Sequence, residues 1–445
     1  MSEPQEKRRK VLEESEESQC QFFVVRKKRH CKLSAAKGSK FCSQHEPITK
    51  TNDKEMGNKS AERVPCPLDP KHSVYAFKLN KHLKICNARP MKNENYIKIG
   101  LNIGSDDEEV VRDNGGHSVK LNELTCEYLK SLMDKINVTY EKFIKKTVVT
   151  VFREHDLLKE ELSKPEFGVT ALKHLKQTAA LLGCLQEYKL LLPHTCFVEF
   201  GAGKGQVSYW IAQAIKHFKQ CSVILVDKAS HRHKKDNKVE DRDAVTRIRA
   251  DIANLDLSWL PHKSESIVGV SKHLCGAATD MTLRCIVAGN QPPKEVNRKL
   301  CRTKGILIAL CCHHRCEWKS FVGKSFLREM GFTLKDFAAM TKIVSWAVCG
   351  SGMSRERRKQ LQEAEDSDDS IDQSSPDEDE DTVKLTRKEK EELGLRCKRI
   401  LDYARIVFLR QNHYNANLIY YVNRDVTLEN VCIVATHEIN KSAPV

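Results

Sequence analysis

The most informative stretch of the sequence is Cys196-Phe197-Val198-Glu199-Phe200-Gly201-Ala202-Gly203-Lys204-Gly205. It begins as a short apolar run of strand type and ends in Gly-x-Gly-x-Gly, and apolar residues then recur at helical spacing from Val207 to Ile215. Glycines at such a turn permit left-handed backbone and a close ligand approach, and the free amides of the following helix face that ligand. A second apolar strand, Ser222–Asp227, ends in a carboxylate at about the 20-residue spacing expected of a group that binds ribose hydroxyls.

The glycine pattern discriminates among nucleotide ligands. A pyrophosphate fingerprint would read G-x-G-x-x-G, and a phosphate loop would need Gly-Lys followed by Ser or Thr, whereas this chain has Gly-Lys-Gly-Gln. The form Glu199-x-Gly201-x-Gly203-x-Gly205 resembles motif I of S-adenosylmethionine-dependent methyltransferases, whose acidic residue can meet the cationic methionine end of the cofactor. A dehydrogenase and a plain strand-to-helix turn are the alternatives.

Composition and charge bound the class of protein. The 445 residues suit one large domain with small modules, and the 18 cysteines suit reduced thiols and metal ligands. With no membrane-spanning run and no signal peptide, we expect an intracellular protein without a membrane partner, in the nucleus or cytoplasm; Lys7-Arg8-Arg9-Lys10 is a candidate import signal. The net charge is +15 although residues 363 to 381 hold eleven acidic side chains, which favours a nucleic-acid partner over a merely basic protein.

Two cysteine- and histidine-containing clusters precede the glycine turn. The first is Cys20-x10-Cys31-x10-Cys42-x2-His45, whose three thiolates and one imidazole match a four-coordinate structural zinc site. His30 competes with Cys31 as the second ligand, and four unrelated residues are the alternative. The segment has too few apolar residues to fold unaided, which supports a metal.

The second cluster is Cys66-x5-His72-x9-His82-x3-Cys86, which resembles the CHHC finger of RNA-modifying and splicing proteins. His82 and Cys86 lie four apart, so a helix would put both on one face. Prolines around Cys66 predict a rigid knuckle, which scattered surface His and Cys residues would not require. The sequence therefore predicts two structural zinc ions.

The order of patterns predicts an α/β fold: a Rossmann-like methyltransferase domain with a seven-stranded, mostly parallel sheet, after two zinc-binding modules and a helical segment. The last two strands are expected near 416–422 and 429–435, after a helix from about Thr386 to Gln411. The predicted segments are a disordered tail (1–17), a CCCH-like module (18–48), a CHHC finger (62–90), a linker (91–118), a helical segment (119–192) and the methyltransferase domain (193–445) with a disordered acidic insertion (about 351–384).

Further candidate site residues follow the strands. Asp251 ends a strand. The resemblance to methyltransferases implies that it faces the adenine amino group and that Ile252 packs on the ring; a helix cap is the competing role for Asp251. Polar runs follow the strands expected at Ser266–Val270 and Gly305–Leu310, where open α/β sheets place ligands. In the second run, Cys311 to Cys316, adjacent Cys and His side chains should diverge, so we expect a substrate-facing loop and not a metal site. Lys173, His174 and Lys176 could contact RNA, but we interpret them as a solvated helix face.

Three sequence blocks accompany the two fingers: Val198-Glu199-Phe200-Gly201-Ala202-Gly203-Lys204-Gly205, Lys272-His273-Leu274-Cys275-Gly276 and Cys311-Cys312-His313-His314. Together with the fingers, these blocks resemble the eukaryotic tRNA 2′-O-methyltransferase family that modifies position 4 of the acceptor stem. The resemblance implies methyl transfer from S-adenosylmethionine to the ribose of cytidine or adenosine in tRNA. Lys272 is the first candidate for base or alkoxide stabiliser. His273 could orient the ribose or accept the proton, and His313 and Arg315 are candidates for base or phosphate contact. Buried structural histidines are the alternative for His273 and His313, and no Lys-Asp-Lys-Glu tetrad can be assigned.

Two other hypotheses remain open. One is a methyltransferase that acts on another RNA or on a base, and the other is a zinc-finger nucleic-acid-binding protein with an inactive methyltransferase fold. The fingers are expected to hold the tRNA body by shape, with protein recruitment as the alternative. The sequence leaves the oligomeric state open.

Overall fold

The computed structural model describes residues 20–24, 29–30, 35, 40–41, 63–84, 86, 94–105, 119–229, 231, 234–241, 243–291, 302–349 and 385–437. The chain divides into two units, Met1–Pro90 and Met91–Val445. The predicted tail (1–17) and acidic insertion (about 351–384) lie outside the described residues.

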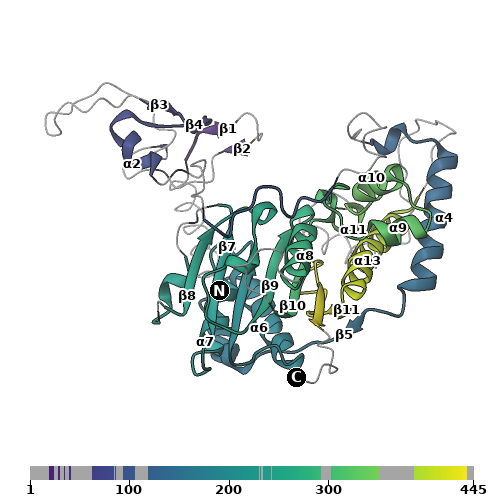
Figure 1. Cartoon of the computed structure of the whole chain (residues 1–445). Helices are drawn as coiled ribbons and strands as arrows, with labels where there is room; N and C mark the ends of the chain where they lie inside the picture. Colours follow the sequence, from purple (N-terminus) through teal and green to yellow (C-terminus); the bar gives the residue numbers. More distant parts are fainter. Residues whose placement is uncertain are drawn as a thin grey trace, which may run out of the picture. The chain divides into compact units, whose positions relative to one another are not determined.

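A single eight-stranded sheet forms the centre of the second unit, in the order β5-β11-β12-β10-β9-β6-β7-β8 (Figure 1). Neighbouring strands from β10 to β8 run parallel, and β12 is antiparallel to both β10 and β11. The predicted mostly parallel sheet is therefore confirmed. Its strands are β5 (Val149–Thr150), β6 (Thr195–Phe200), β7 (Ser222–Asp227), β8 (Val245–Arg249), β9 (Ser266–Cys275), β10 (Thr303–Cys311), β11 (Tyr414–Tyr420) and β12 (Val431–His437).

The sheet differs from the prediction in one strand. Seven strands were expected, and the eighth is β5, whose two exposed residues pair in parallel with Ile419 and Tyr420 at the edge of the sheet. A run of two residues has no period that a sequence pattern could reveal.

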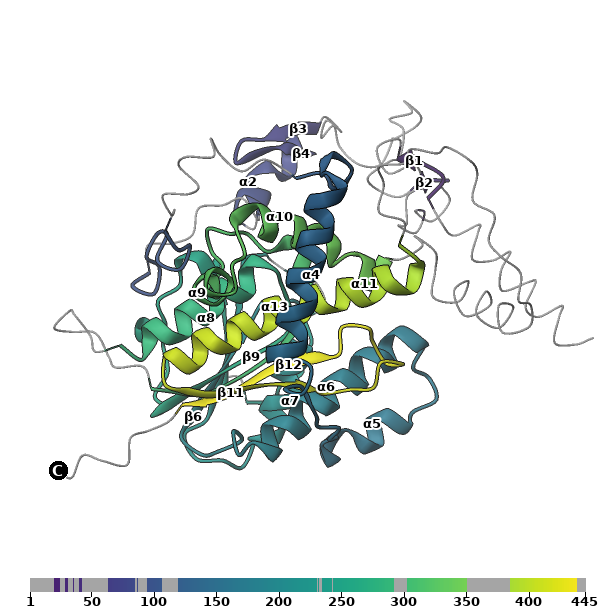
Figure 2. The same ribbon diagram turned by 90° about the vertical axis from the view of Figure 1, so that its right-hand side faces the viewer.

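Helices cover both faces of the sheet. Figure 2 shows α6 (Val169–Glu187) and α7 (Gln206–Ala214) on one side of the strands and α8 (Ala277–Gly289) and α13 (Arg387–Gln411) on the other. Side chains along each strand alternate between these two layers: in β6, Val198 and Phe200 pack in one buried cluster and Phe197 in the other. Both faces are therefore buried, as a doubly covered parallel sheet requires.

A further helical layer packs on α13. It consists of α4 (Cys126–Phe143), α9 (Lys324–Glu329), α10 (Leu334–Ile343) and α11 (Trp346–Cys349), and Figure 2 shows α4 crossing α13. Thr386 and Glu389 form a reciprocal capping box at the start of α13, which confirms the helix predicted from about Thr386 to Gln411. In the described part of the chain, no helix is both long and apolar enough to cross a membrane.

Short elements connect these layers. They are α5 (Lys159–Ser163) and the 3-10 turns η3 (Leu121–Glu123), η4 (Asp156–Leu158), η5 (Asp236–Lys238), η6 (Ile252–Asn254), η7 (Leu257–Trp259) and η8 (His313–Arg315).

The strand β9 is longer than its apolar run indicated. The prediction ended it at Val270, but pairing with β10 continues through Leu274–Leu310 and Cys275–Cys311 after a register shift between Ile308 and Leu310. Lys272 and His273 therefore lie in the strand at this irregularity and not in a loop after it. Extra residues of this kind re-aim side chains near sites.

The described residues of the first unit form two small hairpins. β1 (Phe23–Val24) pairs with β2 (Arg29–His30), and β3 (Arg63–Cys66) pairs with β4 (Asp69–Tyr75), followed by η2 (Ala76–Lys78) and α2 (Leu79–Leu83). The prediction that one helix carries both His82 and Cys86 was wrong, because α2 ends at Leu83. Among the residues described in this unit, the buried apolar ones are all cysteines: Cys20, Cys66 and Cys86.

Candidate active site and metal centre

The glycine turn between β6 and α7 has left-handed backbone at each predicted glycine, with φ of 64° at Gly201, 54° at Gly203 and 72° at Gly205. A Cβ on Gly205 would lie 2.6 Å from Asp236 Oδ1, whereas a Cβ on Gly203 would meet nothing within 4 Å. Gly205 is therefore required by packing. Gly203 borders open space, where a ligand can approach the backbone.

An ion pair that sequence reasoning missed holds this turn. The guanidinium of Arg247 in β8 donates from Nη1 to the Gly203 carbonyl (2.9 Å) and binds Asp236 through Nη2 (2.7 Å) and Nε (3.1 Å). Both side chains are largely buried, so this two-pronged contact fixes the loop geometry. Arg247 stands in a strand pattern, and nothing in the local sequence indicates its partner.

Asp227, at the end of β7, lies beside the turn. Its Oδ2 accepts a hydrogen bond from the Gly203 amide (2.7 Å), and its Oδ1 accepts one from Ala229 (2.8 Å) and lies 3.2 Å from His231 Nε2. The predicted ribose-binding carboxylate is thus held in a fixed orientation at the carboxyl ends of the strands.

Asp251 takes the capping role that the sequence left open, because its Oδ1 accepts from the Ala253 amide (3.1 Å) at the start of η6. Its Oδ2 also binds Lys228 Nζ (2.6 Å). Ile252 is half-buried and packs against the core under α8. Both residues therefore lie in the loop that follows β8, next to β7 in the sheet.

Glu199 is buried, with 3% of its surface exposed. Its Oε2 accepts hydrogen bonds from the amide (2.9 Å) and the hydroxyl of Ser208, in the first turn of α7. Burial raises the pKa of Glu199 to about 7, against the opposing effect of Ser208 and the positive charge of Lys272. Through these hydrogen bonds Glu199 anchors the start of α7, and it lies close enough to Lys272 for the two charges to interact.

Lys272 and His273 bring polar chemistry to the carboxyl end of β9. Burial lowers the pKa of Lys272 to about 8, although Glu199 opposes the shift, and Nζ points to the His174 carbonyl at 3.4 Å. His273 is exposed, but partial desolvation and the charge of Lys272 lower its pKa to about 4. At neutral pH His273 is therefore uncharged, and Lys272 is poised to exchange a proton.

His174 belongs to this group, although the sequence favoured a solvated helix face over contact with RNA. Its ring on α6 lies edge-to-face with His273, with 5.8 Å between the ring centres, and it is half-buried. Burial and Lys272 lower its pKa. Its contact with β9 depends on how α6 packs on the sheet, which no local pattern reveals.

His313 occupies a different, buried network. Its Nε2 lies 2.6 Å from Asp402 Oδ1, and Asp402 also accepts from Arg399 Nη1 (3.1 Å) and Arg405 Nη1 (3.3 Å). Arg405 in turn binds Asp280 through Nε (3.0 Å) and Nη2 (2.7 Å). Burial would raise the pKa of Asp402, but His313 and the two arginines hold it at about 2. This is the buried, hydrogen-bonded environment weighed as the alternative for His313, and it ties η8 to α13.

Arg315 is the last residue of η8, which follows β10, and its backbone packs against Gly276, just after the end of β9. A Cβ on Gly276, whose φ is 51°, would come within 2.3 Å of the Arg315 carbonyl group, so the start of α8 and η8 are in close backbone contact. A hydrogen bond with Cys311 lowers the pKa of the Cys275 thiol, and the positive charge of Arg315 lowers it further.

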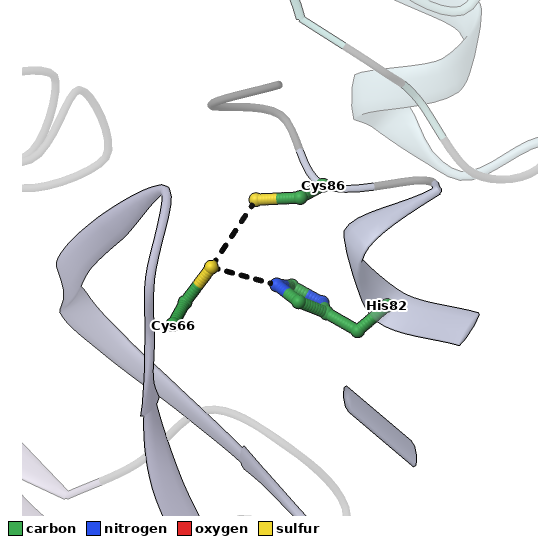
Figure 3. Close-up of side chains that lie close together, drawn as sticks. All are labelled: Cys66, His82 and Cys86. Atoms are coloured by element: carbon green, nitrogen blue, oxygen red, sulfur yellow. Dashed lines mark hydrogen bonds between the residues drawn. The ribbon is translucent and has the colours of Figure 1, made fainter. Parts of the chain in front are cut away.

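Figure 3 shows three of the four predicted zinc ligands of the second finger lying close together. Cys66 Sγ lies 3.2 Å from His82 Nε2 and 3.7 Å from Cys86 Sγ, and all three ligand atoms lie within 4.8 Å of one another. Such separations suit ligands that share one zinc ion at about 2.0–2.3 Å. The fourth predicted ligand, His72, lies in β4, but its side chain is outside the described residues.

The first predicted finger is described only in part. Cys20 is buried, and His30 Nδ1 lies 3.0 Å from the Gln21 carbonyl oxygen. The other predicted ligands, Cys31, Cys42 and His45, lie outside the described residues.

Comparisons with known families match three parts of the chain. Residues 176–436 match Methyltransferase TRM13, residues 18–46 match the CCCH zinc finger in TRM13 protein, and residues 63–87 match the U11-48K-like CHHC zinc finger. The first matched finger contains the predicted ligands Cys20, Cys31, Cys42 and His45. The second contains the predicted ligands Cys66, His72, His82 and Cys86.

Whole-chain relatives agree with these matches. Proteins of Mus musculus and Homo sapiens, each named tRNA:m(4)X modification enzyme TRM13 homolog, are both 35% identical to this chain, and each alignment covers 94% of both partners. The tRNA:m(4)X modification enzyme TRM13 of Scheffersomyces stipitis is 31% identical, over 93% of this chain and all of that protein.

Proposed function

Because the chain belongs to the TRM13 methyltransferase family, we propose that it methylates the ribose 2′-hydroxyl of cytidine or adenosine at position 4 of the tRNA acceptor stem. It is an S-adenosylmethionine-dependent methyltransferase with zinc fingers ahead of its catalytic domain. The words tRNA:m(4)X in the names of its relatives support tRNA and position 4. The motif blocks around Lys272 and Cys311, which resemble those of the 2′-O-methyltransferases, support the ribose.

The cofactor site is proposed at the glycine turn. Gly203 offers an open backbone approach and Asp227 a fixed carboxylate for ribose hydroxyls, while Asp251 and Ile252 border the adenine position. When bound there, S-adenosylmethionine supplies a methyl group already activated on a sulfonium. Arg247 and Asp236 keep this turn in place before any ligand binds, which reduces the ordering cost of binding.

Lys272 is the residue on which the proposed proton removal depends. A ribose hydroxyl must lose a weakly acidic proton as its oxygen attacks, and a lysine with its pKa lowered to about 8 has a substantial neutral fraction near that pH. Lys272 is half-buried near the end of β9, which pairs with β6, the strand that leads into the glycine turn. We assign Lys272 as the proton acceptor and His273, with His174 beside it, as the neutral group that orients the ribose.

Arg315 and His313 are given different roles. Arg315 is a candidate phosphate contact, because its guanidinium lies at the same end of the sheet. His313 is proposed as a positioning residue, since its Nε2 is committed to Asp402 in the buried network that holds η8.

The second finger supports an RNA-binding role for the first unit. The guanidinium of Arg63 lies 4.8 Å from the centre of the Tyr75 ring, and Tyr75 stacks on the exposed ring of Phe77 at 5.6 Å. Lys78 lies 5.2 Å from the Phe77 ring. Basic and aromatic groups side by side suit a nucleic-acid backbone and its bases.

The test is methyl transfer from radiolabelled S-adenosylmethionine to unmodified tRNA transcripts, with the labelled ribose mapped. We expect label at position 4 and a loss of about 10²–10⁴-fold in the single-turnover rate for Lys272→Ala. Lys272→Arg separates two roles, because arginine keeps the charge but cannot release its proton. An inactive Lys272→Arg supports the base, and an active one assigns the lysine to charge stabilisation.

Asp227→Asn is the matched test of cofactor binding. It replaces a charged carboxylate, whose oxygens would accept hydrogen bonds from the ribose hydroxyls, with a neutral amide. We therefore expect cofactor affinity to fall about 10–100-fold. Its rate at saturating cofactor should fall far less than that of Lys272→Ala. Wild-type protein that binds cofactor but labels another RNA would overturn the substrate assignment. Protein that binds tRNA but no cofactor would leave a binding protein with an inactive fold.

A further inference from the structure

Three thiols lie close together at the carboxyl end of the sheet, apart from the cluster of the second finger. Cys275 ends β9, Cys311 ends β10, and Cys312 follows directly; the three sulfurs lie within 4.8 Å of one another. Cys275 and Cys311 are register partners on neighbouring parallel strands, and their sulfurs are 3.6 Å apart. Neither finger match includes any of these residues.

The backbone at Cys312 is what completes the group. Adjacent residues of an extended strand point to opposite faces, so Cys311 and Cys312 should diverge. Cys312 instead has φ of 52° and ψ of 43°, a left-handed conformation that costs a non-glycine residue about 1–2 kcal/mol. A residue is held in such a conformation only where the surroundings determine it, and here it gathers the third thiol with the other two.

Contacts around the thiols fix this arrangement. Gly276 follows Cys275 and lies against the Arg315 backbone so closely that a Cβ would clash at 2.3 Å. His313, directly after Cys312, is tied to Asp402 in α13. The strand ends that carry the sulfurs are therefore held from both sides by a folded core, which favours a preformed site.

We propose that Cys275, Cys311 and Cys312 bind a zinc ion, in addition to those of the fingers. Soft thiolates select zinc, and sulfur ligands at about 2.3 Å from one ion lie at mutual separations like the 3.6 Å seen here. Three thiolates leave a zinc centre with one net negative charge, which the neighbouring Arg315 offsets. With three protein ligands, the fourth position is left to solvent, as at zinc sites that are not purely structural.

A disulfide explains the geometry less well. An S–S bond is about 2.05 Å long, so the 3.6 Å separation is that of two unbonded sulfurs. A disulfide would also use two thiols and leave unexplained the left-handed turn that brings in the third.

The experiment measures zinc in the full-length protein purified under reducing conditions. We expect the Cys275→Ser/Cys312→Ser double variant to hold one equivalent of zinc per chain less than the wild type. These two half-buried positions are chosen because serine is tolerated better there than at buried Cys311. Cys221→Ser is the matched control, since Cys221 is also half-buried but precedes β7 at the opposite end of the strands.

Cobalt substitution gives a second readout. Cobalt in place of zinc reports thiolate ligands through their charge-transfer absorption, and the double variant should lose part of it while the finger contribution remains. Unchanged zinc content and cobalt spectrum in a variant that still binds S-adenosylmethionine would overturn the proposal. A Cys275–Cys311 disulfide found by peptide mapping of the freshly purified wild type would also overturn it.

Discussion

Two groups of candidate metal ligands in the described part of the chain are built in opposite ways. Cys66, His82 and Cys86 lie within 21 residues of sequence, in a unit whose described buried apolar residues are all cysteines. Cys275, Cys311 and Cys312 come from two strands of a large sheet with a buried core on each face. The finger needs its bound metal in order to fold, whereas the thiols at the sheet are brought together by a domain that folds without metal.

The largest predicted effect is the unfolding of the second finger. Zinc contributes about 10–16 kcal/mol to folding in finger peptides, more than the stability of a small unit without a core. We expect Cys66→Ser, which removes a fully buried ligand, to unfold residues 63–86 while the methyltransferase unit stays folded. Limited proteolysis and NMR spectra of the full chain would detect this selective loss.

Cys275→Ser is the matched substitution in the other cluster. It also removes one thiolate, but the sheet beneath it keeps its apolar core, so the unfolding midpoint of the larger unit should change only slightly. A finger that kept its spectrum in Cys66→Ser, or a larger unit that unfolded in Cys275→Ser, would contradict the contrast between the two regions.

The second prediction concerns the backbone of the larger unit. In Gly205→Ala the new Cβ meets Asp236, Leu225 and Arg247 within 2.9 Å at a φ of 72°, so strain and overpacking together should cost about 2–5 kcal/mol. Gly203→Ala is the control, because its Cβ meets nothing and only the left-handed strain of about 1–2 kcal/mol applies. Denaturant unfolding of both variants measures the difference.

The same pair separates folding from binding. Gly203→Ala should weaken S-adenosylmethionine binding more than its small loss of stability suggests, because its methyl group occupies the open approach to the turn. A chelator should not change the gap in stability between the two alanine variants, since this region does not depend on metal for its fold. An equal loss of stability in both variants would show that packing does not distinguish the two glycines.

The sequence predicted the features that local spacing determines. The glycine turn, the mostly parallel sheet and the capped helix after Thr386 follow from periodicity and turn chemistry over short stretches. The convergence of His82 on Cys66 could also be expected from their positions around a proline-bounded knuckle, although the helix ends before Cys86.

Features that depend on strand register and distant packing could not be predicted. Cys275 meets Cys311 only through the pairing of β9 with β10, and Cys312 joins them only through its left-handed backbone. His313 binds Asp402, which lies 89 residues away, and Arg247 binds Asp236 across a loop. Each contact is set by tertiary structure, so no local pattern carried its signal.

The smallest predicted effect is a change of the methylation rate with pH, which depends on Lys272 at the carboxyl end of the sheet. Burial lowers the pKa of Lys272 to about 8, so the neutral amine that can accept a proton is a minor species at pH 7 and the main species at pH 9. The single-turnover methylation rate at saturating cofactor should therefore rise about tenfold across this range and level off above it. His273, with its pKa near 4, stays neutral throughout and adds no second inflection.

Lys272→Arg is the control for this response, because arginine stays protonated over the whole range and its residual rate should be flat. The finger should keep its zinc from pH 7 to 9, since its ligands are already deprotonated when the metal is bound. A rise in rate that persists in Lys272→Arg would move the proton acceptor to another group. A wild-type rate that falls with pH would mean that the charged lysine is the active form, and that the sheet end stabilises the developing alkoxide instead of removing its proton.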